Sequence, residues 1–202
     1  MIDRWALQHL RPALHAGATR LVALGVRADA VTAVGFALGI AGSVAIALGR
    51  PLAGLVLLLL GRVADGLDGT VARLTAPTDR GAFLDVVADF VFYASVPMAF
   101  AVLDPAANAL PAAVLLASFI GTGSSFLGFA VLAARRGLAD TRQPEKGFHY
   151  LGGLTEGGET IACFVLMCLF PQHFAWWAYG FAGLCALTTL GRMIDGARQL
   201  TR

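Results

Sequence analysis

Residues 52–103 have the sequence LAGLVLLLLGRVADGLDGTVARLTAPTDRGAFLDVVADFVFYASVPMAFAVL, and this stretch decides the fold. It contains two apolar runs, each long enough to cross a bilayer, joined by a short polar segment around Pro77. Two aspartates precede this segment, Asp65 and Asp68, and two follow it, Asp85 and Asp89. Because so short a connection holds two helices antiparallel, the sequence predicts a membrane hairpin whose joined ends carry carboxylates.

The whole chain has the composition of an integral membrane protein. Of its 202 residues, 57% are apolar and 14% are charged, and its mean hydropathy is +0.72. A soluble domain carries about a quarter charged residues, so this chain has too little polar surface to cover a water-soluble protein. Its three cysteines all fall in apolar runs, which argues against a disulfide framework or a zinc site. No basic run with interleaved aromatic residues supports nucleic-acid binding.

Six apolar runs are long enough to span a membrane. They are Ala30–Leu48, Leu52–Arg73, Gly81–Leu103, Leu110–Ala134, Thr155–Phe170 and His173–Ile194. Before them, apolar residues at helical spacing beside Arg4 and Arg11 favour an interfacial amphipathic helix within residues 1–29, with a frayed polar leader as the alternative. We therefore expect an all-α integral membrane protein with one domain over residues 1–202, of which residues 30–195 form a six-helix bundle.

The basic residues predict the orientation of this bundle. Thirteen of the 15 lie before the first run, between the second and third runs, between the fourth and fifth, or close to the end of the chain. Arg50 lies in the opposite set of connections, and Arg62 lies inside the second run. The positive-inside rule places both termini and the aspartate hairpin in the cytoplasm, with the chain in the inner membrane.

The spacing of the aspartates predicts a metal centre. Asp65 and Asp68 are three residues apart and Asp85 and Asp89 are four apart, so each pair shares one face of a helix. Four like charges in a low-dielectric site repel one another unless cations compensate them. Ligands that are all oxygen favour Mg²⁺ or Mn²⁺, and two such ions suit displacement at phosphorus.

Three neighbouring residues fit a phosphate ligand. Gly69 and Ala72 leave room for it beside the helix, and Arg73 supplies a planar donor. Arg62, one turn before Asp65, would pair with an acid or with a substrate phosphate, and a buried structural ion pair is an equal alternative. The small residues Gly35 and Gly39, four apart in the first span, are compatible with a close-packing face but do not establish one.

Two other interpretations of the acidic cluster exist. The carboxylates would be solvated at helix ends and neutralised by Arg73 and Arg80, or they would be ligands of a cation or proton transporter. Their pairing on two helix faces disfavours the first interpretation. Their position near the helix ends, away from the midplane, disfavours the second.

The same residues resemble the signature of the CDP-alcohol phosphotransferase family. That signature is D-x-x-D-G-x-x-A-R, eight residues, then G-x-x-x-D-x-x-x-D, and the six predicted spans also resemble the family. The matching positions are Asp65, Asp68, Gly69, Ala72, Arg73, Gly81, Asp85 and Asp89. Seven residues, one fewer than in the signature, separate Arg73 from Gly81.

The resemblance implies an enzyme that transfers the phosphatidyl group of CDP-diacylglycerol to the hydroxyl of a small polar alcohol and releases CMP. Asp65, Asp68 and Asp85 would bind two metal ions, and Asp89 would join them and act as the general base. Gly69, Ala72, Arg73 and Gly81 would hold the nucleotide and its phosphates. The resemblance also implies a homodimer. Transfer from CDP-choline or CDP-ethanolamine to a diacylglycerol is the nearer alternative; a cation-coupled transporter and an inactive scaffold are the others.

The acceptor site is expected near the fourth connection and the fifth span. Lys146 and His149 would receive an acceptor phosphate, whereas Arg135 and Arg136 suit a topological role equally well. Glu156 and Glu159 would recognise acceptor hydroxyls or an amine. The alternative is that Thr155 caps the fifth span while both glutamates complement its helix dipole. The identity of the acceptor does not follow from the sequence.

Overall fold

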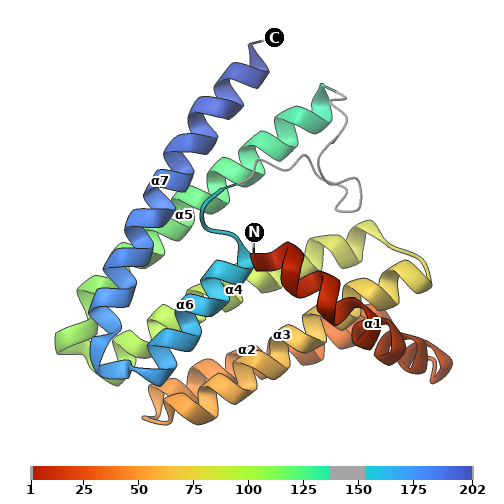
Figure 1. The fold of residues 1–202 in the computed structure, drawn as a ribbon, viewed down its shortest axis with the longest axis horizontal. Coiled ribbons are helices and arrows are strands. Elements are labelled where there is room, and N and C mark those ends of the chain that lie inside the picture. The colour runs from red at the N-terminus through yellow and green to blue at the C-terminus, as the bar shows by residue number, and fades with distance from the viewer. Residues whose placement is uncertain (1, 137–152, 202) are drawn as a thin grey trace.

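A computed structural model describes residues 2–136 and 153–201, and every regular element in these residues is a helix (Figure 1). The long helices are α1 (Ile2–Ala23), α2 (Ala28–Ala47), α3 (Pro51–Leu74), α4 (Asp79–Leu103), α5 (Pro105–Arg135), α6 (Gly157–Leu169) and α7 (Phe174–Leu200). A short 3-10 helix, η2 (Pro171–His173), precedes α7. The predicted all-α class is therefore confirmed for the part of the chain that the structure describes.

Each of the six predicted runs coincides with a helix, although several boundaries differ. The largest shift of a helix start is in α5, which begins at Pro105, five residues before the apolar run. Asp104 causes this early start, because its side chain accepts a hydrogen bond from the Ala107 amide at 3.1 Å. Pro105 then occupies the first helical position, where its missing amide hydrogen costs nothing.

Within residues 2–136 and 153–201, three helices, α2, α4 and α5, are long and apolar enough to cross a membrane. A fourth crossing is possible if α6 and the segment Pro171–Leu200, bent by 114° at the break between them, count as one span. α3 is not one of these candidate spans because its second half is charged, and α6 is not one by itself because it has only 13 residues. Six crossings, and an interfacial position for α1, thus remain predictions.

Glycine residues bring α2 and α3 together. A Cβ atom on Gly61 would lie 2.9 Å from the carbonyl oxygen of Gly35, and one on Gly42 would lie 2.9 Å from that of Gly54. Nothing larger than hydrogen fits at such distances, so the backbones pack directly against each other. Gly35 and Gly39 do belong to a close-packing face. Gly49, at φ 79°, reverses the chain between the two helices.

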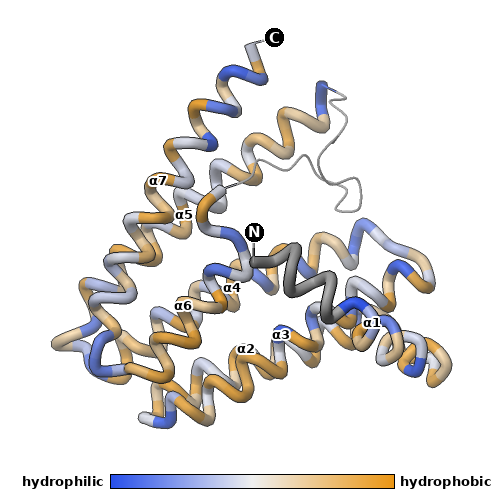
Figure 2. Tube along the Cα trace, in the orientation of Figure 1, coloured by the Kyte–Doolittle hydropathy of each residue, from blue (hydrophilic) through white to orange (hydrophobic). Residues whose placement is uncertain are grey.

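Aromatic side chains from the other helices form the core. Phe92 and Phe100 of α4, Phe164 of α6 and Phe174 of α7 are all essentially inaccessible to solvent. The rings of Phe100 and Phe174 stack with centroids 4.7 Å apart, which fixes the start of α7 against the end of α4. In contrast, many large apolar side chains on the outside are exposed, and Figure 2 shows hydrophobic residues along most of α2 to α6. This outer surface suits a lipid environment.

Two helix pairs enclose a cleft. In Figure 1, α2 and α3 lie side by side, and α5 and α7 form a second pair that diverges from them. The cleft has a volume of about 2280 Å³ and is lined by residues of all seven long helices. The aspartate hairpin of α3 and α4 opens into it.

Candidate metal centre

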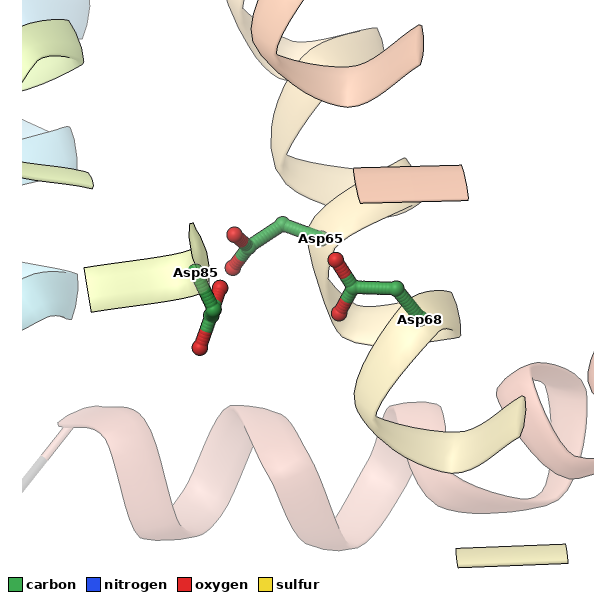
Figure 3. Close-up of side chains that lie close together, drawn as sticks. All are labelled: Asp65, Asp68 and Asp85. Carbon is green, nitrogen blue, oxygen red and sulfur yellow. The ribbon is translucent and has the colours of Figure 1, made fainter. Parts of the chain in front are cut away.

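Three aspartates converge on the cleft from α3 and α4 (Figure 3). Asp65 and Asp68 project from adjacent turns of α3, and Asp85 projects from α4. One carboxylate oxygen of each lies within 4.8 Å of the others. The start of α4 is fixed by Thr78, whose side-chain oxygen accepts a hydrogen bond from the Gly81 amide at 3.0 Å. This cap sets the phase of Asp85, so the seven-residue spacing still brings it to Asp65 and Asp68.

The environment of Asp68 suits a bound cation. Its side chain is 5% exposed, and among the described residues its Oδ2 atom is buried without a hydrogen-bond partner. A buried carboxylate oxygen left in this state is costly unless a cation or a donor satisfies it. Carboxylate oxygens are the ligands that Mg²⁺ and Mn²⁺ prefer. The residues therefore fit a hard divalent ion.

Asp89 is held differently from the other three aspartates. Its Oδ1 atom accepts a hydrogen bond from Nη1 of Arg62 at 2.6 Å. The same Nη1 lies 3.5 Å from Oδ2 of Asp65. Arg62 is thus paired with acids, which fits both the pairing with an acid expected from the sequence and its alternative, a buried structural ion pair. Asp89 lines the cleft, but it is not among the three carboxylates that meet at cation-binding distance.

The predicted nucleotide-binding residues all line the same cleft: Gly69, Ala72, Arg73 and Gly81. The Arg73 guanidinium lies against Gly69, where a Cβ atom would be 3.3 Å from Nη1. Arg73 also donates a hydrogen bond to the Thr70 hydroxyl at 3.1 Å. At Gly81 a Cβ atom would lie 3.1 Å from the Thr78 hydroxyl, so this glycine leaves space for the helix cap.

The two glutamates predicted near the acceptor cap a helix. Glu156 is the N-cap residue of α6, and Glu159 accepts a hydrogen bond from the Glu156 amide at 3.2 Å in a capping box. The alternative in which Thr155 caps the helix is wrong in that detail, because Glu156 is the N-cap and the Thr155 hydroxyl is hydrogen-bonded to that of Thr188 at 3.0 Å. Glu156 lines the cleft. Lys146 and His149, the other predicted acceptor residues, lie outside the described residues.

One cleft residue was missed by the sequence interpretation. Arg192 of α7 is 7% exposed and lines the cleft, and its Nη1 atom donates a hydrogen bond to the carbonyl of Thr122 in α5 at 3.1 Å. From the sequence, Arg192 is expected only to contribute to the membrane topology. The sequence does hold a signal for a role in the cleft: Arg192 lies inside the predicted span His173–Ile194, and ionisable residues within a span are usually functional.

The chain matches a known protein family and a known relative. A sequence model of the CDP-alcohol phosphatidyltransferase family matches residues 26–191. The chain is also 50% identical over 196 residues to the inner membrane protein YnjF of Escherichia coli, covering 97% of this chain and 95% of that protein.

Solved structures of phosphatidylinositol phosphate synthase (PgsA1) from Mycobacterium tuberculosis share the fold. One with CDP-DAG bound matches with a TM-score of 0.68 at 19% identity, covering 91% of this chain and 92% of that chain. Another, in complex with manganese and citrate, also has a TM-score of 0.68, at 20% identity, covering 91% of this chain and 88% of that chain. At these identities the likeness concerns the fold alone.

Proposed function

Because this chain belongs to the CDP-alcohol phosphatidyltransferase family, we propose that it transfers the phosphatidyl group of CDP-diacylglycerol to the hydroxyl of a small polar alcohol and releases CMP. The observation that carries this proposal is the meeting of Asp65, Asp68 and Asp85 in one cleft of a helical membrane protein. The CDP-DAG bound in the similar synthase structure supports the donor. Transfer from CDP-choline or CDP-ethanolamine to a diacylglycerol is the alternative within the family.

The metal ligands would be Asp65, Asp68 and Asp85, with Asp89 beside them. Mg²⁺ and Mn²⁺ both suit such oxygen ligands, and the manganese complex of the similar synthase supports Mn²⁺. When bound, the ion supplies positive charge that stabilises the negative charge of the donor diphosphate and of the departing CMP. A bound cation would be coordinated by the Oδ2 atom of Asp68, which is buried without a hydrogen-bond partner among the described residues.

Residues of this chain would bind the donor phosphate and the nucleotide and would accept the proton of the acceptor. Arg73 would hold a donor phosphate, and Gly69, Ala72 and Gly81 would leave space for the nucleotide in the cleft. Asp89 would accept the proton of the acceptor hydroxyl on its carboxylate as the new oxygen–phosphorus bond forms and the bond to CMP breaks. Since Asp89 lines the same cleft as Asp65, the reacting groups would meet in one cleft.

The membrane setting supports this reaction. With six spans in the inner membrane and both termini in the cytoplasm, the acyl chains of the donor would stay in the bilayer while its head group enters the cleft. The exposed apolar surface of the helices supports the lipid setting, and the inner-membrane name of the E. coli relative supports the location. A homodimer is the expected assembly for the family.

The acceptor would enter the part of the cleft bounded by α5, α6 and α7. Arg192 places positive charge there, which favours an acceptor that carries a phosphate. Glu156 and Glu159 do not argue against such an acceptor, because the helix N-terminus engages both of them. Lys146 and His149, which come between α5 and α6 in the sequence, would add to the site.

An acceptor panel tests the proposal. Purified protein with CDP-diacylglycerol and Mn²⁺ or Mg²⁺ is given glycerol 3-phosphate, inositol 1-phosphate, inositol, serine, glycerol or a phosphatidyl lipid, and CMP is measured. We expect CMP with one acceptor, its loss in Asp89→Asn, and full activity in Asp195→Asn, an exposed aspartate outside the cleft. CMP with CDP-choline and diacylglycerol instead would indicate the other reaction. Ion uptake into vesicles that needs no CDP-lipid would indicate a transporter.

A further inference from the structure

Thr188 of α7 is a buried threonine whose hydroxyl holds another segment of the chain. The residue is 3% exposed, and its Oγ1 atom accepts hydrogen bonds from the backbone amides of Leu154 and Thr155, both at 3.1 Å. The Thr155 hydroxyl is hydrogen-bonded to the same oxygen at 3.0 Å. Because buried backbone amides need acceptors, this one hydroxyl attaches residues 153–155 to α7.

Gly153 lets this segment lie directly on α7. A Cβ atom on Gly153 would be 2.3 Å from Cγ2 of Thr188, which is closer than any side chain approaches another. The same atom would be 3.3 Å from Nη2 and 3.4 Å from Nε of Arg192, so the Gly153 backbone lies against the guanidinium. Thr188 and Arg192 are four residues apart on one helix, and they therefore face the segment together.

Arg192 also contacts α5. Its Nη1 atom donates a hydrogen bond to the Thr122 carbonyl at 3.1 Å, and its guanidinium carbon lies 5.9 Å from the centroid of the Phe126 ring. The guanidinium thus contacts both α5 and residues 153–155, at the end of the cleft bounded by α5, α6 and α7. If residues 153–155 moved away from α7, the guanidinium would lose one of these contacts and become more accessible.

We propose that Thr188 is a positioning residue for the acceptor end of the cleft, because its hydroxyl keeps residues 153–155 packed over the Arg192 guanidinium. Arg192 lines the cleft and Thr188 does not, so Thr188 acts through Arg192. The inference rests on the proposed function in assigning the acceptor to this end of the cleft. The donor phosphates are expected beside the aspartates of α3 and α4, so the loss of the Thr188 hydroxyl should affect the acceptor alone.

Phenylglyoxal, a reagent for accessible arginine side chains, tests the attachment without turnover. The full chain in detergent is treated with it, and mass spectrometry gives the reaction rate at Arg192 relative to the exposed Arg198. Thr188→Val keeps the shape of the side chain and removes three hydrogen bonds, so we expect Arg192 to react about 10-fold faster than in the wild type. Thr188→Ser keeps the hydroxyl and should react at the wild-type rate.

Thr189→Val is the matched control, because the Thr189 hydroxyl donates a hydrogen bond to the Cys185 carbonyl of its own helix, at 2.9 Å. It removes a hydroxyl from the neighbouring position of α7 without touching residues 153–155. We expect the wild-type rate of Arg192 modification in this variant.

Steady-state kinetics separate the acceptor from the donor. With the acceptor that yields CMP in the panel above, Thr188→Val should raise the KM for the acceptor by about 10-fold and leave the KM for CDP-diacylglycerol unchanged. Thr188→Ser and Thr189→Val should keep both wild-type values. A hydroxyl that only stabilised the fold would not change the KM of one substrate selectively.

The outcomes separate the inference from the proposed function. Equal rates of Arg192 modification in Thr188→Val and the wild type overturn the inference, as does an unchanged acceptor KM or an equal rise in both KM values. Should Thr188→Val fail to fold, Gly153→Ala takes its place with the same expected results, since the added methyl group would push residues 153–155 away from Thr188. Absence of CMP with every donor and acceptor would contradict the proposed function, and the rates of Arg192 modification would then decide the inference alone.

Discussion

Gly61 of α3 lies so close to Gly35 of α2 that a Cβ atom on Gly61 would be 2.9 Å from the Gly35 carbonyl oxygen. This contact falls one residue before Arg62 and about one helical turn before Asp65. The close approach of two backbones thus sets the position of the side chains that form the metal centre.

Gly61→Ala should destabilise the protein by about 1–3 kcal/mol, because the added methyl group has to push two backbones apart. Gly180→Ala is the matched control, since among the described residues a Cβ atom at this position of α7 would meet nothing within 4 Å beyond its own stretch of helix. There we expect no loss, and up to about 1 kcal/mol of gain from the better helix propensity of alanine. Thermal unfolding in detergent measures both. Equal unfolding temperatures for the two variants would contradict the close-packing argument.

Asp68→Asn should abolish high-affinity Mn²⁺ binding, because the substitution replaces a negatively charged carboxylate ligand with a neutral amide. We expect CMP release to fall by at least about 100-fold, the effect typical of losing a group that supports charge stabilisation. Asp195→Asn provides the control for charge removal at an exposed site. Mn²⁺ titration and CMP release on the same samples check the prediction, and retained Mn²⁺ affinity in Asp68→Asn would refute it.

Asp89→Asn should separate catalysis from metal binding. If Asp89 is the general base and Arg62 its partner, kcat should fall by about 10²–10⁴-fold while Mn²⁺ still binds at Asp65, Asp68 and Asp85. Steady-state rates and Mn²⁺ titration give the two readouts. Loss of the ion together with the activity would show instead that Asp89 is an indispensable metal ligand.

Glu156→Ala should affect stability more than acceptor binding, because Glu156 and Glu159 form the capping box of α6. Loss of an N-cap side chain costs about 1 kcal/mol, and we expect a lower unfolding temperature with an unchanged KM for the acceptor. Glu156→Asp, which keeps a good capping residue, should restore most of the stability. A raised KM at wild-type stability would assign Glu156 to the acceptor instead.

The spacing of residues along the chain was enough to predict which aspartates of the metal centre lie together. Asp65 and Asp68 had to share a face because they are three residues apart on one helix, and the short connection to α4 had to bring Asp85 near them. Asp89 was expected on the same face as Asp85. Its contact with Arg62 depends on how α4 rotates against α3, which Phe92 and Gly39 determine by packing.

The sequence by itself determined the helical class, the positions of the helices, the hairpin and the family, because these depend on apolar periodicity, helix-ending residues and a long local motif. Only the tertiary structure decided which partners the polar side chains take. Thr155 pairs with Thr188 and leaves the cap to Glu156, and Arg192 reaches the cleft beside α5. These contacts join residues more than 30 positions apart, so they exist only once α6 and α7 have packed against the other helices.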